Sequence, residues 1–197
     1  YQVNYTFPMH TSFNGDAFAW YRDLRAAQQA DYTAYVDTGR FKIVCVSPEL
    51  FFTLKDGRLR TRPMKGTRAR GRWLEEDERY AEELLLSEKD RAENVMIVDL
   101  LRNDISRTCQ PGTVRVTGLC EVERFETVLH LVSTVVGTLR DDCDVWDLMS
   151  GCFPGGSITG APKIRAMEII AELEATERGA YCGSLFFLGP CGDFDSS

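Results

Sequence analysis

The order of apolar and polar positions along the chain predicts short strands interrupted by a few helices. Phe18, Tyr21 and Leu24 recur at helical spacing, which predicts a first helix over residues 17–29. Apolar runs of strand length then predict four strands, at residues 32–36, 41–46, 50–54 and 59–61. The sequence Lys-Asp-Gly at 55–57 is typical of a hairpin turn between the last two of these strands.

The second half of the chain continues this mixed pattern. An acidic stretch at 74–86 predicts a helix, and Ser87 begins a longer one that ends near Asp104. Residues 87–90 resemble a capping box in which Asp90 replaces the usual Glu or Gln. The remaining predictions are strands at 113–117, 122–126, 129–139 and 181–188, and a helix at 161–174 with Pro162 in its first turn. Strands clustered in this way favour an α+β fold over a regularly alternating parallel sheet.

Composition is that of an ordinary globular protein. The 197 residues are 44% hydrophobic and 27% charged, and this length suits one large domain or two small ones. A net charge of −7 disfavours binding to nucleic acid or to an anionic membrane, because both need excess Lys and Arg. No apolar run approaches the ~20 residues that span a bilayer. A small anionic substrate is still compatible with positive groups gathered inside a cleft.

Cysteine usage indicates the cellular compartment. Seven scattered cysteines without a Cys-x-x-Cys pair indicate reduced thiols in a cytoplasmic protein. Only two histidines are present, and neither is near a cysteine pair, which disfavours structural zinc. The first ten residues lack the basic start and apolar core of a signal peptide. Because the chain begins at Tyr1 without Met and stops soon after a strand-like run, we expect a fragment.

Glu49 is a candidate general acid. It lies between the apolar runs IVCV and LFF, where burial would raise the pKa of its carboxyl. A general acid needs such a raised pKa to hold its proton near neutral pH. The alternative interpretation is a solvated glutamate at the end of a strand.

Lys65 is a candidate nucleophile. Pro63 stiffens the backbone before it, and Gly66 after it permits positive φ or close approach. A nucleophilic lysine must be neutral, which requires its pKa to be lowered by desolvation or by nearby cations. The cations nearest in sequence are Arg62, Arg68 and Arg70. The alternative interpretation is a solvated surface lysine.

Glu93 lies on a predicted helix face that is otherwise mostly apolar. At about 100° per residue, its side chain falls within about 40° of Ile97 and Leu100, on the same face as Asp104. A carboxylate there must be paired, neutralised or bound to a metal. Ligation by oxygen alone would favour Mg²⁺ over zinc. The alternative interpretation is a salt bridge to Arg or Lys.

Residues 153–163 (FPGGSITGAPK) place glycines and small side chains directly before a predicted helix. Free backbone N–H groups and the helix dipole there would suit a carboxylate or phosphate, although the Walker order is absent. The alternative is a tight structural loop. His130 stands between Leu129 and Leu131, so strand alternation directs it away from both, either into a cleft or to a core or edge position.

Six sequence strings, in this order, resemble the catalytic domain of the chorismate-binding enzymes over essentially the whole chain. They are SPELFF at 47–52, RPMKGT at 62–67, SEKDRAENVMIVDLLRND at 87–104, HLVSTVVG at 130–137, FPGGSITGAPKIRAM at 153–167 and RGAYCG at 178–183. The resemblance implies an anthranilate-synthase-like α+β fold with two packed, mainly antiparallel sheets, outer helices and an active site in the cleft between. It also implies that residues 1–197 are a partial catalytic domain, without its N- and C-terminal parts.

Two positions distinguish the branches of this family. Branches that add water to chorismate have a lysine base where this chain has Gln2, and an amide cannot act as that base. Anthranilate synthases usually have alanine where this chain has Lys65, whereas aminodeoxychorismate synthases commonly have lysine. The resemblance therefore implies amination of chorismate to 4-amino-4-deoxychorismate for folate synthesis. The ammonia would come from a glutamine amidotransferase subunit or domain.

The resemblance also implies roles for individual residues. Lys65 would attack the chorismate ring, Glu49 would protonate the leaving hydroxyl, and ammonia would then displace Lys65. Mg²⁺ would hold the ring carboxylate, with Glu93 as one ligand. The implied lining of the substrate pocket is Gly66, Thr67, His130, Thr159, Gly160, Ala161 and Tyr181. A second metal carboxylate and an arginine that grips substrate would lie beyond Ser197, so we expect little activity from the chain alone.

Three alternative functions stay open at this stage. The first is an anthranilate synthase component, which also eliminates pyruvate. The second is a truncated, non-catalytic domain that binds a glutaminase partner. The third is an anion-binding module built on the glycine-rich loop at 155–163.

Overall fold

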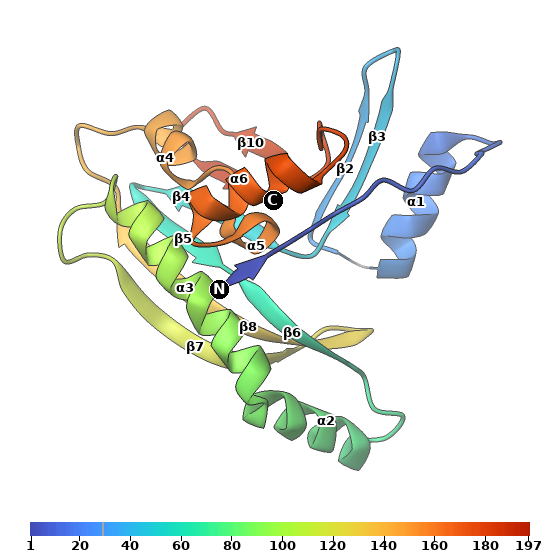
Figure 1. Cartoon of the computed structure of the whole chain (residues 1–197), viewed down its shortest axis with the longest axis horizontal. Coiled ribbons are helices and arrows are strands. Elements are labelled where there is room, and N and C mark those ends of the chain that lie inside the picture. The colour runs from blue at the N-terminus through green and yellow to red at the C-terminus, as the bar shows by residue number, and fades with distance from the viewer. Residues whose placement is uncertain (29) are drawn as a thin grey trace.

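The computed structural model describes residues 1–28 and 30–197 (Figure 1). Its helices are α1 (Ala17–Gln28), α2 (Leu74–Leu86), α3 (Glu88–Ser106), α4 (Val145–Cys152), α5 (Gly156–Thr159) and α6 (Lys163–Leu173). Its strands are β1 (Gln2–Val3), β2 (Tyr32–Asp37), β3 (Lys42–Ser47), β4 (Leu50–Lys55), β5 (Arg58–Arg62), β6 (Met64–Ala69), β7 (Arg115–Arg124), β8 (Val128–Thr138), β9 (Gly160–Ala161), β10 (Phe186–Leu188) and β11 (Phe194–Ser196). Within these described ranges, no helix is both long and apolar enough to cross a bilayer.

Seven strands form one large sheet in the order β10-β11-β4-β5-β8-β6, with β7 also paired to β8. Every pairing in this sheet is antiparallel. Strands β2 and β3 form a separate hairpin, and β1 pairs with β9. Figure 1 shows the β2–β3 hairpin and α1 standing out to one side of the large sheet. The predicted α+β class with mainly antiparallel sheets is confirmed.

Helix α3 lies along one face of the large sheet and supplies much of the core (Figure 1). Its buried side chains Ile97, Val98 and Ile105 are at most 2% exposed. Fully burying a side chain of this kind contributes roughly 1.5–3 kcal/mol. Val98 and Ile105 pack in one cluster with the sheet residues Phe52, Leu54, Leu59 and Val135. Helix α3 is therefore held rigidly on the sheet, and loops that pack against its other side have a fixed position.

Ser87 begins α3 through one half of the predicted capping box. Its hydroxyl oxygen accepts the backbone N–H of Asp90 at 3.3 Å. The Asp90 carboxylate does not complete the box, because it binds Arg68 of β6 at 3.0 Å. The predicted cap is confirmed for Ser87. Its acidic partner instead ties the first turn of α3 to the sheet.

Some boundaries differ from the predictions where strands are irregular. Arg115–Arg124 is one strand, where the sequence predicted two at 113–117 and 122–126, because register shifts around Gly118 break the alternation. The strand β6 and the helix α4 were not predicted. The helix predicted at 17–29 is confirmed over Ala17–Gln28, and residue 29 lies outside the described residues.

Two predictions in the last part of the chain need correction. The helix predicted at 161–174 begins at Lys163, because Ala161 pairs with β1. The strand predicted at 181–188 is limited to Phe186–Leu188, and turns occupy its first part. Apolar side chains alone indicated a strand there, but a strand also needs a paired neighbour.

A nearly buried ion pair after α6 holds three segments together. Arg178 contacts Glu174 at 2.6 Å, and their side chains are only 14% and 6% exposed. The guanidinium also donates to the backbone carbonyls of Ile158 at 2.8 Å and Asn4 at 2.7 Å. Glu174 accepts the backbone N–H of Thr6 at 3.0 Å and its hydroxyl at 3.2 Å. The pair therefore joins the N-terminal segment to the loop that carries α5.

Acid should weaken the Arg178–Glu174 ion pair, because it protonates the Glu174 carboxylate. The Arg178 guanidinium, helped by Thr6, lowers the pKa of the Glu174 carboxyl from its ordinary 4.5 to about 2. A carboxyl with a lowered folded-state pKa stabilises the fold above its unfolded pKa, and this contribution is lost as the pH falls through the folded pKa. We expect the free energy of unfolding to fall more steeply in the wild type than in Glu174→Gln between about pH 5 and pH 2. Urea denaturation at each pH measures it.

Glu168→Gln is the matched control, because Glu168 pairs with Arg165 at the surface, where the two side chains are 54% and 58% exposed. Its unfolding free energy should follow that of the wild type across the same pH range. Parallel profiles for the wild type and Glu174→Gln would contradict a stabilising role for the ionised Glu174 carboxylate.

Candidate active site

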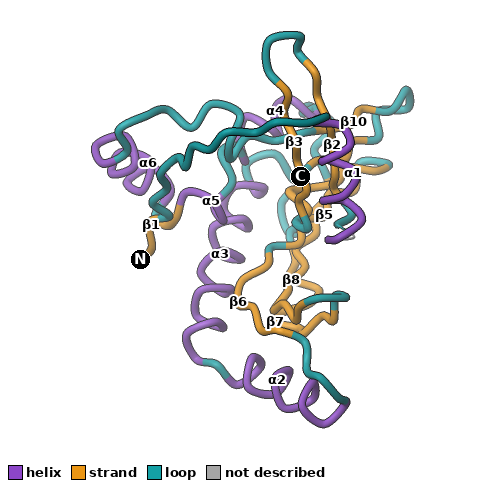
Figure 2. Tube along the Cα trace, turned by 90° about the vertical axis from the view of Figure 1, so that its right-hand side faces the viewer, coloured by secondary structure: helices purple, strands orange, loops and turns teal. Residues whose placement is uncertain are grey.

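Glu49 and Lys65 come from different strands and meet on Ser157. Glu49 directly precedes β4, Lys65 lies near the start of β6, and Ser157 lies in α5. The Ser157 hydroxyl donates to Glu49 Oε1 at 2.9 Å, and Lys65 Nζ donates to the Ser157 carbonyl at 3.1 Å. Figure 2 shows α5 and β1 together beside α3, on the same side of the molecule. One residue of the glycine-rich loop therefore contacts both side chains.

Glu49 has the electrostatic environment of a proton donor. Burial raises the pKa of its carboxyl, and the Ser157 hydroxyl, the positive charge of protonated Lys65 and the Met64 N–H offset only part of that rise. A carboxyl with a raised pKa keeps its proton closer to neutral pH, as a general acid requires. The alternative of a fully solvated glutamate does not fit this partly buried position.

Lys65 is held by a backbone carbonyl. Among the described residues, its Nζ takes part in no salt bridge with a carboxylate. The arginines nearest in sequence each have an acidic partner: Arg62 binds Glu123, Arg68 binds Asp90 and Arg70 binds Asp77. Their charges are therefore largely compensated, and they do not act as free cations beside Lys65. A neutral amine can donate one N–H to the Ser157 carbonyl and still keep its lone pair.

Gly66 makes the bulge that sets the course of β6 beyond Lys65. Its φ of +83° lies in the left-handed region, and the pairing of β6 with β8 shifts register between Lys65 and Thr67. A Cβ at Gly66 would lie 2.9 Å from Cβ of Asp90 in α3. The expected positive φ and close approach at this glycine are confirmed, and any larger residue would push β6 away from the helix.

Strand β8 places Thr67 and His130 on the other face of the sheet. Lys65 pairs with Leu131, which is fully buried in the cluster beneath α2, whereas Thr67 pairs with His130. Successive strand residues point to opposite faces, so Thr67 and His130 lie on the face away from α2. There Thr67 Oγ1 and His130 Nδ1 are 3.1 Å apart, with the Phe125 ring edge-on to the imidazole. The structure brings these two predicted residues together, on a different face from Lys65.

Glu93 lies on the α3 face between β6 and α5. Asp90, nearly one turn earlier, is packed against β6, and Ile97, one turn later, lies close to α5. The Glu93 side chain is 30% exposed, and its nearest cation is Lys89 at 3.8 Å, itself 83% exposed. An exposed pair at that distance is weak. The Glu93 carboxylate is therefore part-exposed and held by no strong ion pair.

Metal binding can be tested against these side chains. The described residues contain no group of three or more His, Cys, Asp or Glu that could hold a metal ion. Glu93 fits as a single oxygen ligand, because Mg²⁺ uses one or two carboxylates with waters and substrate oxygens. Asp104, on the same helix face, is not available, because it pairs with Lys163 at 2.5 Å with both side chains nearly buried. The salt-bridge alternative holds for Asp104 and only weakly for Glu93.

Thr159, Gly160 and Ala161 lie where the loop meets the N-terminal strand. Thr159 Oγ1 donates to the Gly155 carbonyl at 2.9 Å, and Ala161 pairs with Gln2. Gly160 has a φ of +130°, and a Cβ there would lie 2.0 Å from the Gln2 carbonyl oxygen. These three residues therefore fix the end of the loop through tight backbone contacts.

Tyr181 lies in a turn after α6. Its side chain is 64% exposed, and its backbone N–H donates to the Arg178 carbonyl at 3.1 Å. The structure therefore gathers Glu49, Lys65 and residues 159–161 around α5, with Glu93 on the adjacent helix. Among the described contacts, none brings Tyr181 to that group.

Two residues of the site, Ser157 and Asn4, carry no sequence signal of their role. Asn4 Nδ2 donates to the Ser157 carbonyl at 2.7 Å, beside Lys65 Nζ. The acceptor is a backbone carbonyl, which every residue has, so no side-chain pattern marks it. Only the glycines around Ser157 indicated that the backbone of this loop could come close to a ligand or to another segment.

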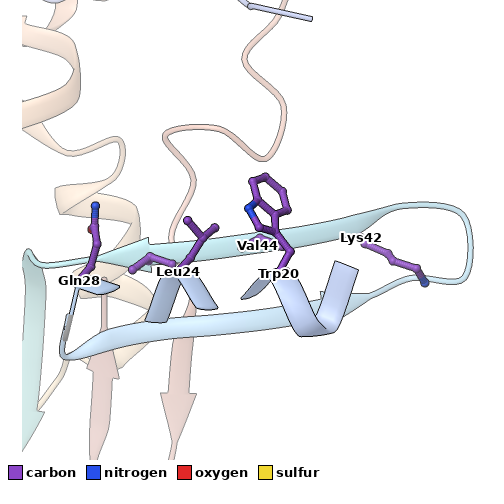
Figure 3. A pocket seen from close by; sticks show the side chains of 6 residues that line it. Trp20, Leu24, Gln28, Lys42 and Val44 are labelled. Carbon is purple, nitrogen blue, oxygen red and sulfur yellow. The ribbon is translucent and has the colours of Figure 1, made fainter. Parts of the chain in front are cut away.

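A hollow of about 410 Å³ lies elsewhere, between α1 and β3 (Figure 3). Its lining residues are Trp20, Leu24 and Gln28 from α1, and Lys42, Val44 and Val46 from β3. No residue of the group around Ser157 lines it. The hollow is therefore separate from the candidate active site.

Comparison with known proteins relates this geometry to a family. A family model described as chorismate binding enzyme matches residues 1–197. Aminodeoxychorismate synthase component 1 of Klebsiella aerogenes is 48% identical over 197 residues, which are 100% of this chain and 44% of that protein. Anthranilate synthase component 1 of Aquifex aeolicus is 46% identical over 183 residues, 93% of this chain and 37% of that protein.

A solved structure supports the same relationship. Anthranilate synthase component I from Streptococcus pneumoniae superposes with a TM-score of 0.85 at 39% identity, covering 94% of this chain and 40% of that one. The anthranilate-synthase-like fold implied by the sequence strings is confirmed. The chain spans less than half the length of these relatives. Because the family model matches the chain from its first residue to its last, the chain belongs to the chorismate binding enzyme family.

Proposed function

We propose that the protein carrying this chain aminates chorismate to 4-amino-4-deoxychorismate. The observation that carries the proposal is the meeting of Lys65 and Glu49 on Ser157. An amine and a carboxyl of raised pKa at one place are the two groups needed to displace a ring hydroxyl covalently. The similarity to aminodeoxychorismate synthase components of Klebsiella aerogenes and Bacillus subtilis, at 48% and 47% identity, supports it.

The proposed reaction has two displacements. In the first, the Lys65 amine forms a bond to the ring, the bond to the ring hydroxyl breaks, and Glu49 supplies the proton with which it leaves as water. In the second, ammonia forms its bond to the ring and the bond to Lys65 breaks. The incoming ammonia gives up one proton, which restores the Glu49 carboxyl. The net reaction exchanges a hydroxyl for an amino group and releases water.

Mg²⁺ is part of the proposal, with Glu93 as one of its ligands. Bound there, the ion would neutralise the ring carboxylate of the substrate and hold it in place. The part-exposed, weakly paired Glu93 carboxylate, on the α3 face between the contacts with β6 and α5, supports this assignment. We propose that ammonia comes from a glutamine amidotransferase subunit or domain, and that the reaction takes place in the cytoplasm.

Anthranilate formation is the second candidate. It is favoured by the 46% identity to the Aquifex aeolicus protein and by the structural match at TM-score 0.85. Both reactions start from chorismate and ammonia, but anthranilate formation also eliminates pyruvate. Strong product fluorescence without an added lyase would identify anthranilate, and its absence with consumed chorismate would favour the aminated ring. Lys65 is the residue on which the first proposal depends.

Replacing Lys65 with alanine in the full-length protein should abolish formation of 4-amino-4-deoxychorismate. No amine is then left to form the covalent intermediate. Products formed from chorismate, Mg²⁺ and ammonia are identified and timed by mass spectrometry. Lys55→Ala, at the exposed end of β4, is the control and should keep the wild-type rate. Product formation by Lys65→Ala at the original rate would reject Lys65 as the nucleophile.

Replacing Glu93 with alanine should weaken the response to Mg²⁺. We expect the Mg²⁺ concentration for half-maximal rate to rise at least about tenfold, because even partners of metal ligands have effects of this size. The rate is measured against Mg²⁺ after removal of bound metal with a chelator. Glu88→Ala, an exposed change in the first turn of α3, should leave the curve unchanged. An identical Mg²⁺ dependence in Glu93→Ala would exclude this carboxylate as a ligand.

A further inference from the structure

The Ser157 carbonyl oxygen receives two side-chain donors from different segments of the chain. Lys65 Nζ approaches it at 3.1 Å from β6, and Asn4 Nδ2 approaches it at 2.7 Å from the segment that follows β1. A carbonyl oxygen has two lone pairs, so both bonds can be made at once. The two donors are 61 positions apart in sequence, so the shared acceptor is a feature of the fold.

Asn4 is held firmly by its own contacts. Its backbone N–H donates to the Thr159 carbonyl at 2.9 Å, and its backbone carbonyl accepts Arg178 Nη2 at 2.7 Å. Its side-chain oxygen accepts Gln2 Nε2 at 3.2 Å. Asn4 therefore stays in place when a neighbouring side chain moves. Lys65 is different, because its flexible stem carries the amine that has to reach a substrate.

Because Asn4 shares the Ser157 carbonyl, the Lys65 amine can leave that carbonyl at a lower cost in free energy. To attack a substrate, the amine must leave the Ser157 oxygen. A polar atom in a partly buried site that loses its last partner is strongly destabilised. With Asn4 still bound, the Ser157 carbonyl keeps one hydrogen bond throughout. The hydrogen bond to Ser157 thus positions the Lys65 amine before the reaction, and it can be broken without leaving the carbonyl unpaired.

We propose that Asn4 is a positioning residue for Lys65, which keeps the Ser157 carbonyl paired while the amine moves onto its target. The inference rests on the proposed function for its consequence in catalysis, because it takes Lys65 as the reacting group. The hydrogen-bonding argument itself concerns only the release of the Lys65 amine from the Ser157 carbonyl. That release can be measured without any turnover.

The experiment measures how fast Lys65 reacts with a limiting amount of acetic anhydride in full-length protein. Peptide mapping by mass spectrometry follows acetylation of Lys65, with Lys89, which is 83% exposed, as the reference in the same sample. Asn4→Leu removes the donor at similar size. Asn4→Ala also removes it and adds neither bulk nor charge beside the Lys65 amine, so a folding defect in one variant leaves the other. Melting temperatures verify that each variant is folded.

We expect acetylation of Lys65 relative to Lys89 to slow about tenfold in both Asn4 variants. In these variants the Ser157 carbonyl has no hydrogen-bond donor left once the Lys65 amine moves away. The kcat for aminated product should fall by a similar factor, with KM little changed. Thr6→Val is the matched control in the same segment. It removes the 3.2 Å hydroxyl contact to Glu174 and keeps the backbone one, so both rates should match the wild type.

The outcomes separate the inference from the proposed function. Wild-type acetylation of Lys65 in folded Asn4 variants would overturn the positioning role. Slow acetylation in the Asn4 variants but not in Thr6→Val supports it. If acetylation slows while kcat is unchanged, Asn4 still positions the amine, and the nucleophilic role of Lys65 in the proposed function is rejected.

Discussion

Two hydrogen bonds to Ser157 hold an acidic and a basic side chain from different strands beside each other. The hydroxyl binds Glu49 and the carbonyl accepts Lys65, so both depend on where α5 lies. Helix α3 fixes that place, because a Cβ on Gly156 would lie 2.3 Å from Leu100 Cδ2. The fold therefore sets the site through the packing of a short glycine-rich segment on a long buried helix. A small displacement of that segment would separate the two side chains and leave the sheet intact.

The electrostatics of the site follow from the same packing. Burial raises the pKa of the Glu49 carboxyl, while Ser157 and Lys65 favour its ionised form and keep the rise within bounds. The neighbouring arginines are bound to carboxylates of the sheet and of the helices, so they stabilise the scaffold. A proton donor and an amine thus share one place without a strong surplus of positive charge. This balance suits a reaction in which a hydroxyl leaves and an amine enters.

Features that depend on residue type and spacing could be predicted from the sequence. The apolar face of α3 follows from helical periodicity, and the chemistry of Glu49 and Lys65 follows from their side chains. Contacts made through backbone atoms could not be predicted, as the Ser157 carbonyl demonstrates. Alternation did predict that His130 points away from its leucine neighbours. The pairing of Thr67 with His130, on the opposite face from Lys65, depends on the bulge at Gly66, which shifts the register of the strand pair and which periodicity cannot reveal.

A ¹³C NMR titration of the Glu49 carboxyl, in the wild type and in Ser157→Ala, tests the central arrangement most directly. The signal is assigned by its loss in Glu49→Gln. The wild-type midpoint should lie above the ordinary glutamate value of 4.5. It should rise further in Ser157→Ala, because the hydroxyl favours the charged form. An ordinary midpoint that Ser157→Ala leaves unchanged would contradict both the burial of Glu49 and its contact with Ser157.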